Sequence, residues 1–287
     1  MTRGVPFVKM EGCGNDYVYL DLGLARPAEP IPAAFPDLAR RLSDRRYGIG
    51  SDGLIALSLG GRASVVMRMW NADGSEGKLC LNGLRCAAKL AAGILPGLGA
   101  AFTMDTAAGP RRVRILGDPA SETCDVEVEV GRPDFRRASL PALGAGEELW
   151  GEPFEAAGMR LLGYAVSVGN PHLVLVLPDE EAVARFPIEA LAPLSVAERF
   201  PEGMNVHVVA PGEARVRMRT WERGSGATLA CGSGAVAVYA VSRRLGPAAA
   251  EAEIAMPGGS VRLREGAAGL VMRGPAREVF RGTFPLR

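Results

Sequence analysis

Lysine and histidine are scarce in this sequence, and their scarcity argues against two kinds of active site. Lysine occurs only at Lys9, Lys78 and Lys89, none in a distinctive setting, which disfavours a pyridoxal phosphate enzyme holding its cofactor as a lysine Schiff base. The 2 histidines, His172 and His207, do not form the closely spaced pair typical of a metal site. The glycines form neither a dinucleotide-binding fingerprint nor a phosphate-binding loop. We therefore expect no cofactor and no metal.

Long apolar runs and paired cysteines are missing as well. No run approaches the roughly 18 consecutive apolar residues of a membrane-spanning helix, and residues 1–7 lack the apolar stretch of a secretory signal. The 5 cysteines contain no Cys-x-x-Cys pair, so neither a disulfide framework nor a zinc ribbon is indicated. The net charge is +1, without a dense basic run. These absences predict a cytoplasmic protein that binds neither nucleic acid nor membrane.

What the sequence does contain is an internal repeat. Residues 68–83 and 219–234 share an Arg, a Trp, a Cys and the Gly three positions after the Cys, all at one offset of 151 residues. A Gly-Asn pair at residues 14–15 is similarly repeated at residues 169–170. A repeat of about half of the 287 residues predicts two similar domains.

Each half of the sequence alternates short strands with one helix of small or apolar residues. Strands are predicted at residues 7–21, 54–59, 64–70, 102–106, 111–116, 124–130, 161–168, 173–177, 205–209, 215–221 and 277–281. Helices are predicted at residues 36–47, 84–92 and 234–245, with a short helical piece at 188–192. A helix that is apolar on nearly every face, as at 234–245, must be enclosed, so each lobe should wrap its strands around one helix.

The domain boundaries are predicted from composition. The N-terminal lobe should span residues 1–132 and be joined by the C-terminal strand at 276–287. The second lobe should span residues 133–275. Residues 136–158 are rich in Pro, Gly, Ala and Glu, which favours a crossing between the lobes there.

Cys80 and Cys231 stand just before the two repeated helices. A helix N-terminus carries unpaired N–H groups and partial positive charge, so it should lower the thiol pKa and hold a carboxylate beside the sulfur. With both thiols facing one cleft, one thiolate would remove an α-proton while the opposite thiol protonates the other face. This predicts a cofactor-independent racemase or epimerase. Cys13, Cys86 and Cys124 have no counterpart in the other half, and we interpret them as buried structural residues.

Motifs along nearly the whole chain resemble those of the diaminopimelate epimerase family. They lie at residues 12–17, 47–52, 71–76, 167–172, 222–226, 230–234 and 257–260. Glu-Arg-Gly-Ser-Gly followed by Ala-Cys-Gly-Ser-Gly is the most specific of them. The resemblance implies an α+β fold of two pseudo-symmetric lobes, each a mixed sheet around a central buried helix, with the active site in the cleft between them. It also implies interconversion of LL- and meso-2,6-diaminopimelate in lysine and peptidoglycan biosynthesis.

The resemblance further implies a division of labour among the site residues. Cys80 and Cys231 would be the acid/base pair, with His172 assisting Cys80 and Glu222 assisting Cys231. The distal amino-acid end of the substrate would be bound by Asn15, Asn71, Asn170, Asn205, Glu222 and Arg223. The reacting carboxylate would be held by backbone N–H groups after each cysteine, in Leu81, Asn82, Gly83, Gly232 and Ser233. Amides, a guanidinium and a carboxylate suit an ammonium and a carboxylate as ligands.

Two departures from the family pattern keep alternatives open. Leu81 replaces a glycine of the family; a helical backbone would tolerate leucine there, whereas a positive φ would strain it. Gly53 stands where glutamine is common. Both departures favour testing other amino acids, as for a histidine- or proline-type racemase. His207 would share a strand face with Asn205 and is a rival base. A thiol–disulfide switch is the alternative from another class, and a homodimer is expected by family likeness alone.

Overall fold

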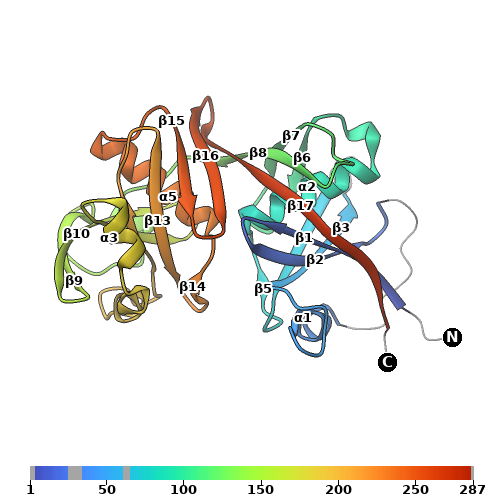
Figure 1. Ribbon diagram of the computed structural model, residues 1–287, viewed down its shortest axis with the longest axis horizontal. Helices are drawn as coiled ribbons and strands as arrows, with labels where there is room; N and C mark the ends of the chain where they lie inside the picture. Colours follow the sequence, from blue (N-terminus) through green and yellow to red (C-terminus); the bar gives the residue numbers. More distant parts are fainter. Residues whose placement is uncertain (1–3, 25–33, 61–64, 286–287) are drawn as a thin grey trace. The chain divides into compact units, whose positions relative to one another are not determined.

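The computed structural model describes residues 4–24, 34–60 and 65–285 and divides into two compact units. Unit 1 consists of Met1–Val128 and Arg273–Arg287, and unit 2 consists of Glu129–Met272. Figure 1 shows that two long strands, β8 (Thr123–Gly131) and β17 (Gly269–Pro285), carry the chain from one unit to the other. The crossing predicted at residues 136–158 is wrong, because that segment lies wholly within unit 2.

Unit 1 contains most of the N-terminal elements. Its remaining strands are β1 (Gly4–Gly12), β2 (Asn15–Asp21), β3 (Gly53–Leu59), β4 (Val65–Asn71), β5 (Glu76–Gly77), β6 (Ala101–Asp105) and β7 (Arg111–Leu116). Its helices are α1 (Phe35–Ser43), α2 (Leu81–Ile94) and the 3-10 turn η1 (Pro96–Leu98). The single strand predicted at 7–21 is two strands, because Cys13 and Gly14 adopt positive φ and form a hairpin turn. The strand predicted from residue 64 begins at Val65, and residue 64 itself lies outside the described residues.

Unit 2 contains the elements that the repeat predicts and several that it does not. Its strands are β9 (Trp150–Ala156), β10 (Met159–Ser167), β11 (Pro171–Val176), β12 (Asn205–Ala210), β13 (Arg215–Glu222), β14 (Gly226–Thr228), β15 (Glu251–Met256) and β16 (Gly259–Gly266). Its helices are η2 (Arg137–Ser139), α3 (Glu180–Arg185), η3 (Ile188–Leu191), α4 (Ala192–Ser195) and α5 (Gly232–Leu245). Pro193, which follows the short helical piece predicted at 188–192, lies in the first turn of α4, where its missing N–H costs nothing.

The two units have the same strand pairing. In unit 1, β1–β2, β3–β4 and β6–β7 are antiparallel, whereas β2–β3 and β4–β6 are parallel. In unit 2, β10–β11, β12–β13 and β15–β16 are antiparallel, whereas β11–β12 and β13–β15 are parallel. In unit 1 the sheet closes on itself, since β17 pairs with both β1 and β8. The sequence repeat is therefore a repeat of topology, and the mixed α+β class is confirmed.

A central helix is packed inside each unit. The first 12 residues of α2, Leu81–Ala92, are all buried, and α2 packs against β1, β2, β3, β4 and β7. Helix α5 packs in the same way against β10, β11, β12, β13, β15 and β16. Such enclosure explains why both helices consist mainly of small and apolar residues. Arg85 and Lys89 of α2 are also buried, and each donates a hydrogen bond to a backbone carbonyl, of Pro275 and of Pro119. None of the described helices is long and apolar enough to cross a membrane.

Shorter helices cover the outer faces of the strands. Helix α1 packs Leu38 and Leu42 onto β2, β3 and β4, where Phe35 stacks on Trp70 with ring centroids 4.5 Å apart. In unit 2, Val183 of α3 joins a second core on the outer side of β12. The N-termini of the two central helices, α2 and α5, are capped by the residues that precede them, Cys80 and Cys231.

Candidate active site

Cys80 is the N-cap of α2 in unit 1. Its backbone is extended, with φ −125° and ψ 119°, and its sulfur accepts a hydrogen bond from the Gly83 N–H at 3.4 Å. The Cys80 thiol donates in turn to Oδ1 of Asn15 at 3.2 Å. The thiol therefore satisfies one orphan donor of the helix and faces a neutral amide oxygen.

A partly exposed charge network holds Asn15 in this orientation. Its Nδ2 donates to Oδ2 of Asp52 at 2.7 Å, so its oxygen is turned toward the Cys80 thiol. Arg45 joins Asp52 to Asp16 through hydrogen bonds of 2.9 and 2.8 Å. Burial and the neighbouring Asp16 raise the pKa of Asp52 above its usual value. Asp52 was not among the predicted site residues, although it lies in a family motif.

Cys231 is the N-cap of α5 in unit 2, with nearly the same geometry. Its φ is −122° and its ψ 107°, and its sulfur accepts from the Gly234 N–H at 3.3 Å. Its thiol donates to Oε2 of Glu222 at 3.0 Å, and the other oxygen of Glu222 accepts from the Thr228 hydroxyl at 2.5 Å. The hairpin of β13 and β14 brings Glu222 and Thr228 to this helix end. The predicted pairing of Glu222 with Cys231 therefore has a direct contact.

The expected lowering of the thiol pKa is wrong for Cys231. Burial, and then the charge of Glu222, raise its pKa well above the usual thiol value, against the opposing hydrogen bond from Gly234. The side chain is only 3% exposed. One helix-end N–H is too weak to offset the loss of solvent and a carboxylate in contact. Cys231 therefore rests as a thiol whose proton is directed at Glu222.

His172 lies at the start of β11 within a chain of polar side chains. Its Nε2 is 2.9 Å from Oδ1 of Asn170, and its Nδ1 is 2.8 Å from Nε2 of His207. Asn170 donates through Nδ2 to the Ser233 hydroxyl at 3.4 Å, and that hydroxyl is 3.7 Å from the Cys231 sulfur. Both imidazoles are wholly buried. The predicted residues Asn170, His172 and Ser233 are thus connected to one another.

Burial also makes both histidines poor bases. It lowers the pKa of His207 to about 3, and it lowers the pKa of His172 well below 6.5, with further contributions from His207 and Arg223. His207 was considered as a rival base. Its two ring nitrogens are occupied by His172 and by the Thr220 hydroxyl, which lies 2.5 Å away.

The remaining predicted binding residues divide into two groups. Asn205 accepts at Oδ1 from the Arg223 backbone N–H at 3.0 Å and donates to the Pro171 carbonyl at 3.0 Å, so it ties β12 to the site loops. The Arg223 guanidinium is exposed and donates to the Glu202 carbonyl. Asn71 is exposed at the end of β4 and donates to the Ser75 hydroxyl.

The first turn of each helix supplies the other predicted residues. Leu81, Asn82 and Gly83 open α2, and Gly232 and Ser233 open α5. Leu81 is helical and is absent from the positive-φ residues of the described chain, so leucine is tolerated there. The Asn82 side chain is 1% exposed, and its Oδ1 has no hydrogen-bond partner in the described structure.

Gly53, the second departure from the family pattern, has a local cause. A Cβ at this position would lie 2.2 Å from the Trp70 carbonyl oxygen and 2.9 Å from the Tyr17 ring. Strands β2, β3 and β4 approach one another too closely there for a side chain. The glycine is therefore required by strand packing in this chain.

The other three cysteines are buried thiols, and none of them caps α2 or α5. Desolvation raises the pKa of Cys86 to about 12, and it also raises the pKa of Cys13 and of Cys124. Across residues 4–24, 34–60 and 65–285, no cluster of three or more His, Cys, Asp or Glu side chains is arranged to hold a metal ion.

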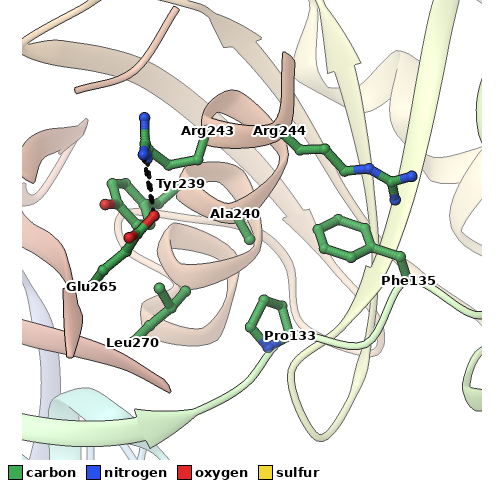
Figure 2. Close-up of a pocket in the computed structure, with 8 residues that line it drawn as sticks. All are labelled: Pro133, Phe135, Tyr239, Ala240, Arg243, Arg244, Glu265 and Leu270. Atoms are coloured by element: carbon green, nitrogen blue, oxygen red, sulfur yellow. Dashed lines mark hydrogen bonds and ion pairs between the residues drawn. The ribbon is translucent and has the colours of Figure 1, made fainter. Parts of the chain in front are cut away.

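A hollow of about 300 Å³ lies beside the far end of α5 (Figure 2). Its charged side chains already have partners: Arg243 pairs with Glu265 at 3.2 Å, and the Arg244 guanidinium lies 4.7 Å from the centre of the Phe135 ring. Cys231 caps the other end of the same helix. None of the residues predicted for the site lines this hollow, so it does not extend the cysteine site.

Comparison with known sequences then decides the family. The chain matches the family described as diaminopimelate epimerase over residues 7–135 and 164–279. The chain belongs to the diaminopimelate epimerase family. It is 40% identical to the diaminopimelate epimerase of Geobacillus kaustophilus, over 99% of this chain and 98% of the relative. It is 36% identical to that of Moorella thermoacetica, over 98% of this chain and 99% of the relative.

Solved structures with the same fold are much more distant in sequence. A predicted epimerase from Pseudomonas aeruginosa superposes with a TM-score of 0.67 at 17% identity, over 99% of this chain and 100% of that one. A hydroxyproline epimerase from Agrobacterium vitis superposes with a TM-score of 0.59 at 15% identity, over 99% of this chain and 92% of that one. These likenesses show that the fold of the diaminopimelate epimerase family extends to chains of low identity.

Proposed function

We propose that this chain interconverts LL- and meso-2,6-diaminopimelate without a cofactor, using Cys80 and Cys231 as proton donor and acceptor. The observation that supports this most strongly is the duplicated cap: in each unit a cysteine sulfur accepts a helix-end N–H and directs its thiol at a second polar group. The curated relatives with 36–40% identity carry the name of this activity. This reaction requires one proton carrier for each face of the α-carbon.

The two caps would share the work unequally. Cys231, whose proton points at the Glu222 carboxylate, would start as the thiol acid when Cys80 takes the substrate proton as thiolate. In the reverse direction Glu222 would accept the Cys231 proton and so generate the second thiolate. The first-turn N–H groups after each cysteine would hold the reacting carboxylate, as helix N-termini favour anions. His172 would assist from the Cys80 side of the substrate.

The distal end of diaminopimelate needs ligands for both an ammonium and a carboxylate. Asn15, Asn71, Asn170 and Asn205 offer amide donors and acceptors, and Arg223 is an exposed guanidinium next to Glu222. We propose these residues as the distal binding set. A racemase of another amino acid is less well supported, because the glycine at position 53 is explained by strand packing and Leu81 is accommodated in the helix.

The test is isotope exchange with diaminopimelate in deuterated water. The wild type should convert each epimer into the other and place solvent deuterium at the product α-carbon. Cys80→Ala and Cys231→Ala should each reduce interconversion by about 10³-fold, because each removes the proton carrier of one face. Cys124→Ala, a buried cysteine far from both caps in sequence, is the matched control and should remain active.

A second measurement tests whether the two sulfurs meet. Oxidation by diamide should join Cys80 and Cys231, each losing its hydrogen to the oxidant, and should inactivate the enzyme reversibly. Peptide mass spectrometry identifies the bond. Full activity in the Cys80→Ala, Cys231→Ala double variant would remove the two-thiol mechanism. Turnover of histidine or proline in preference to diaminopimelate would favour the alternative racemase.

We also propose that the enzyme acts in the cytoplasm. All five cysteines are thiols rather than disulfides, which fits a reducing compartment such as the cytoplasm. A small amino-acid substrate is the only partner that the site chemistry requires. A homodimer follows from the family resemblance and would be tested by light scattering.

A further inference from the structure

A continuous run of hydrogen bonds crosses the interior of unit 2. It passes from the Thr220 hydroxyl to Nδ1 of His207, from Nε2 of His207 to Nδ1 of His172, and from Nε2 of His172 to Oδ1 of Asn170. The three separations are 2.5, 2.8 and 2.9 Å. Register places the partners: Thr220 lies directly opposite His207 on the antiparallel pair β12–β13.

The hydrogen bonds of this run can point in only one direction, from Thr220 toward Asn170. Asn170 uses its NH₂ group toward Ser233, so its oxygen faces His172 and His172 must donate from Nε2. A neutral imidazole carries one N–H, which makes Nδ1 of His172 an acceptor, and His207 must then donate from its own Nε2. Nδ1 of His207 is left as an acceptor and is filled by the Thr220 hydroxyl. Complete burial of both rings keeps them neutral.

The corresponding place in unit 1 is apolar. By strand register and repeat, His207 corresponds to Ile55 and Thr220 to Met69, which face each other across β3–β4. The helix contact is also the same: a Cβ on Gly83 would lie 2.6 Å from Ile55, and a Cβ on Gly234 would lie 2.5 Å from the His207 ring. The fold is therefore satisfied by an apolar pair here, so the polar pair of unit 2 serves something other than packing.

We propose that His207 and Thr220 are positioning residues that hold His172 as its neutral Nε2–H tautomer. Nδ1 of His172 accepts the hydrogen bond from His207, so it has no free lone pair. His172 therefore presents only a hydrogen-bond donor, Nε2–H, on the side of Asn170. If the chain has the proposed function, His172 in this tautomer assists by donating a hydrogen bond to an anion, such as a substrate carboxylate or a thiolate. It does not assist by removing a proton. The tautomer itself does not depend on the reaction.

The test uses the fact that the chain has only 2 histidines. Protein labelled with ¹⁵N-histidine should show two imidazoles in a long-range ¹H–¹⁵N correlation spectrum at neutral pH, both with the pattern of Nε2–H. Signals are assigned with His207→Gln, which keeps an N–H donor toward His172. A His172 signal of the Nδ1–H form, or of an imidazolium, would overturn the proposal.

Variants separate positioning from packing. Thr220→Val keeps the shape but removes the hydroxyl, so His172 should become a mixture of tautomers and kcat for diaminopimelate should fall about tenfold with little change in KM. Thr220→Ser should restore both. Met69→Val changes the equivalent residue of unit 1 and should leave both histidine signals unchanged.

Each outcome decides the matter. A loss of kcat in Thr220→Val with an unchanged His172 spectrum would contradict the inference, as would mixed tautomers with unchanged kcat. Should Thr220→Val not fold, the double variant His207→Ile, Thr220→Met imports the pair that unit 1 tolerates and is measured in the same way. A wild type with both Nε2–H signals but without epimerase activity would refute the proposed function and leave the tautomer assignment standing.

Discussion

The two cysteine caps differ in one element of chemistry within a common frame. Both sulfurs accept the N–H three residues ahead, at 3.4 Å in α2 and 3.3 Å in α5. Cys80 then faces the amide oxygen of Asn15, whereas Cys231 faces the carboxylate of Glu222. An amide accepts a hydrogen bond but cannot take up a proton, and a carboxylate can do both. The two caps therefore share a helix-end frame and differ in the group that each thiol faces.

The side chains that hold the acceptor group at each cap also differ between the two units. Asn15 is held by Asp52 within a network that ends in exposed Arg45. The polar residues behind Cys231 run inward to two buried histidines. Unit 1 therefore orients its cap with charges near solvent, and unit 2 with neutral groups in the interior, where hydrogen-bond direction is fixed more strictly.

Among changes that leave both thiols in place, the largest expected effect comes from altering the acceptor at each cap. Glu222→Gln should lower kcat about 100-fold because the proton acceptor is lost. It should also lower the pKa of Cys231, since the carboxylate raises it. Alkylation of Cys231 by iodoacetamide, followed by mass spectrometry, should begin at lower pH than in the wild type.

Asn15→Asp is the reciprocal change. It places a carboxylate beside Cys80 and next to Asp52, so alkylation of Cys80 should slow and kcat should fall about tenfold. Unchanged alkylation profiles in both variants would show that the two caps do not differ as described.

A smaller effect should come from the glycines behind the caps. Gly83→Ala would press a methyl group onto flexible Ile55, whereas Gly234→Ala would press one onto the His207 ring. Overpacking costs about 1–3 kcal/mol, and we expect the larger loss for Gly234→Ala because the imidazole is held on two sides. Urea denaturation measures the free energy of unfolding. Equal losses of free energy in the two variants would contradict the expectation that the His207 ring yields less readily than the Ile55 side chain.

The two units should also differ in acid sensitivity. Both histidines lie in unit 2, and their folded pKa values are below the unfolded value of about 6.5. Below about pH 6.5 the histidines therefore bind protons in the unfolded chain but stay neutral in the folded unit. The free energy of unfolding is highest above about pH 6.5 and decreases as the pH falls. The loss approaches about 1.4 kcal/mol per pH unit for each histidine.

Hydrogen exchange can locate that loss. Between about pH 6.5 and 5, above the usual carboxylate range, amides of α5 should lose protection while those of α2 do not. His207→Ile should reduce the pH dependence of α5. An equal loss of protection in both helices would point to a cause other than the buried histidines.

The sequence allowed the two helix ends to be located but not their surroundings. A repeated cysteine before a repeated glycine is a local signal. Both helices are present but begin directly after the cysteine, at Leu81 and Gly232, rather than at the predicted residues 84 and 234. The family resemblance implied that Glu222 assists Cys231, and the hairpin of β13 and β14 brings the two side chains into contact. Asp52 and Thr220 were missed because their contacts depend on strand register, which pairs residues distant in sequence. The raised pKa of Cys231 was missed for a related reason: depth of burial is a property of the folded unit and has no local pattern.

Strand β17 has a consequence for the order in which the molecule is made. Unit 1 closes only when residues near the C-terminus pair with β1, from Gly4 opposite Pro285 to Glu11 opposite Arg277. Unit 2, in contrast, is one uninterrupted stretch. On the ribosome the portion translated first must therefore wait with an unpaired strand edge until the last residues emerge, while the portion translated second can finish before it.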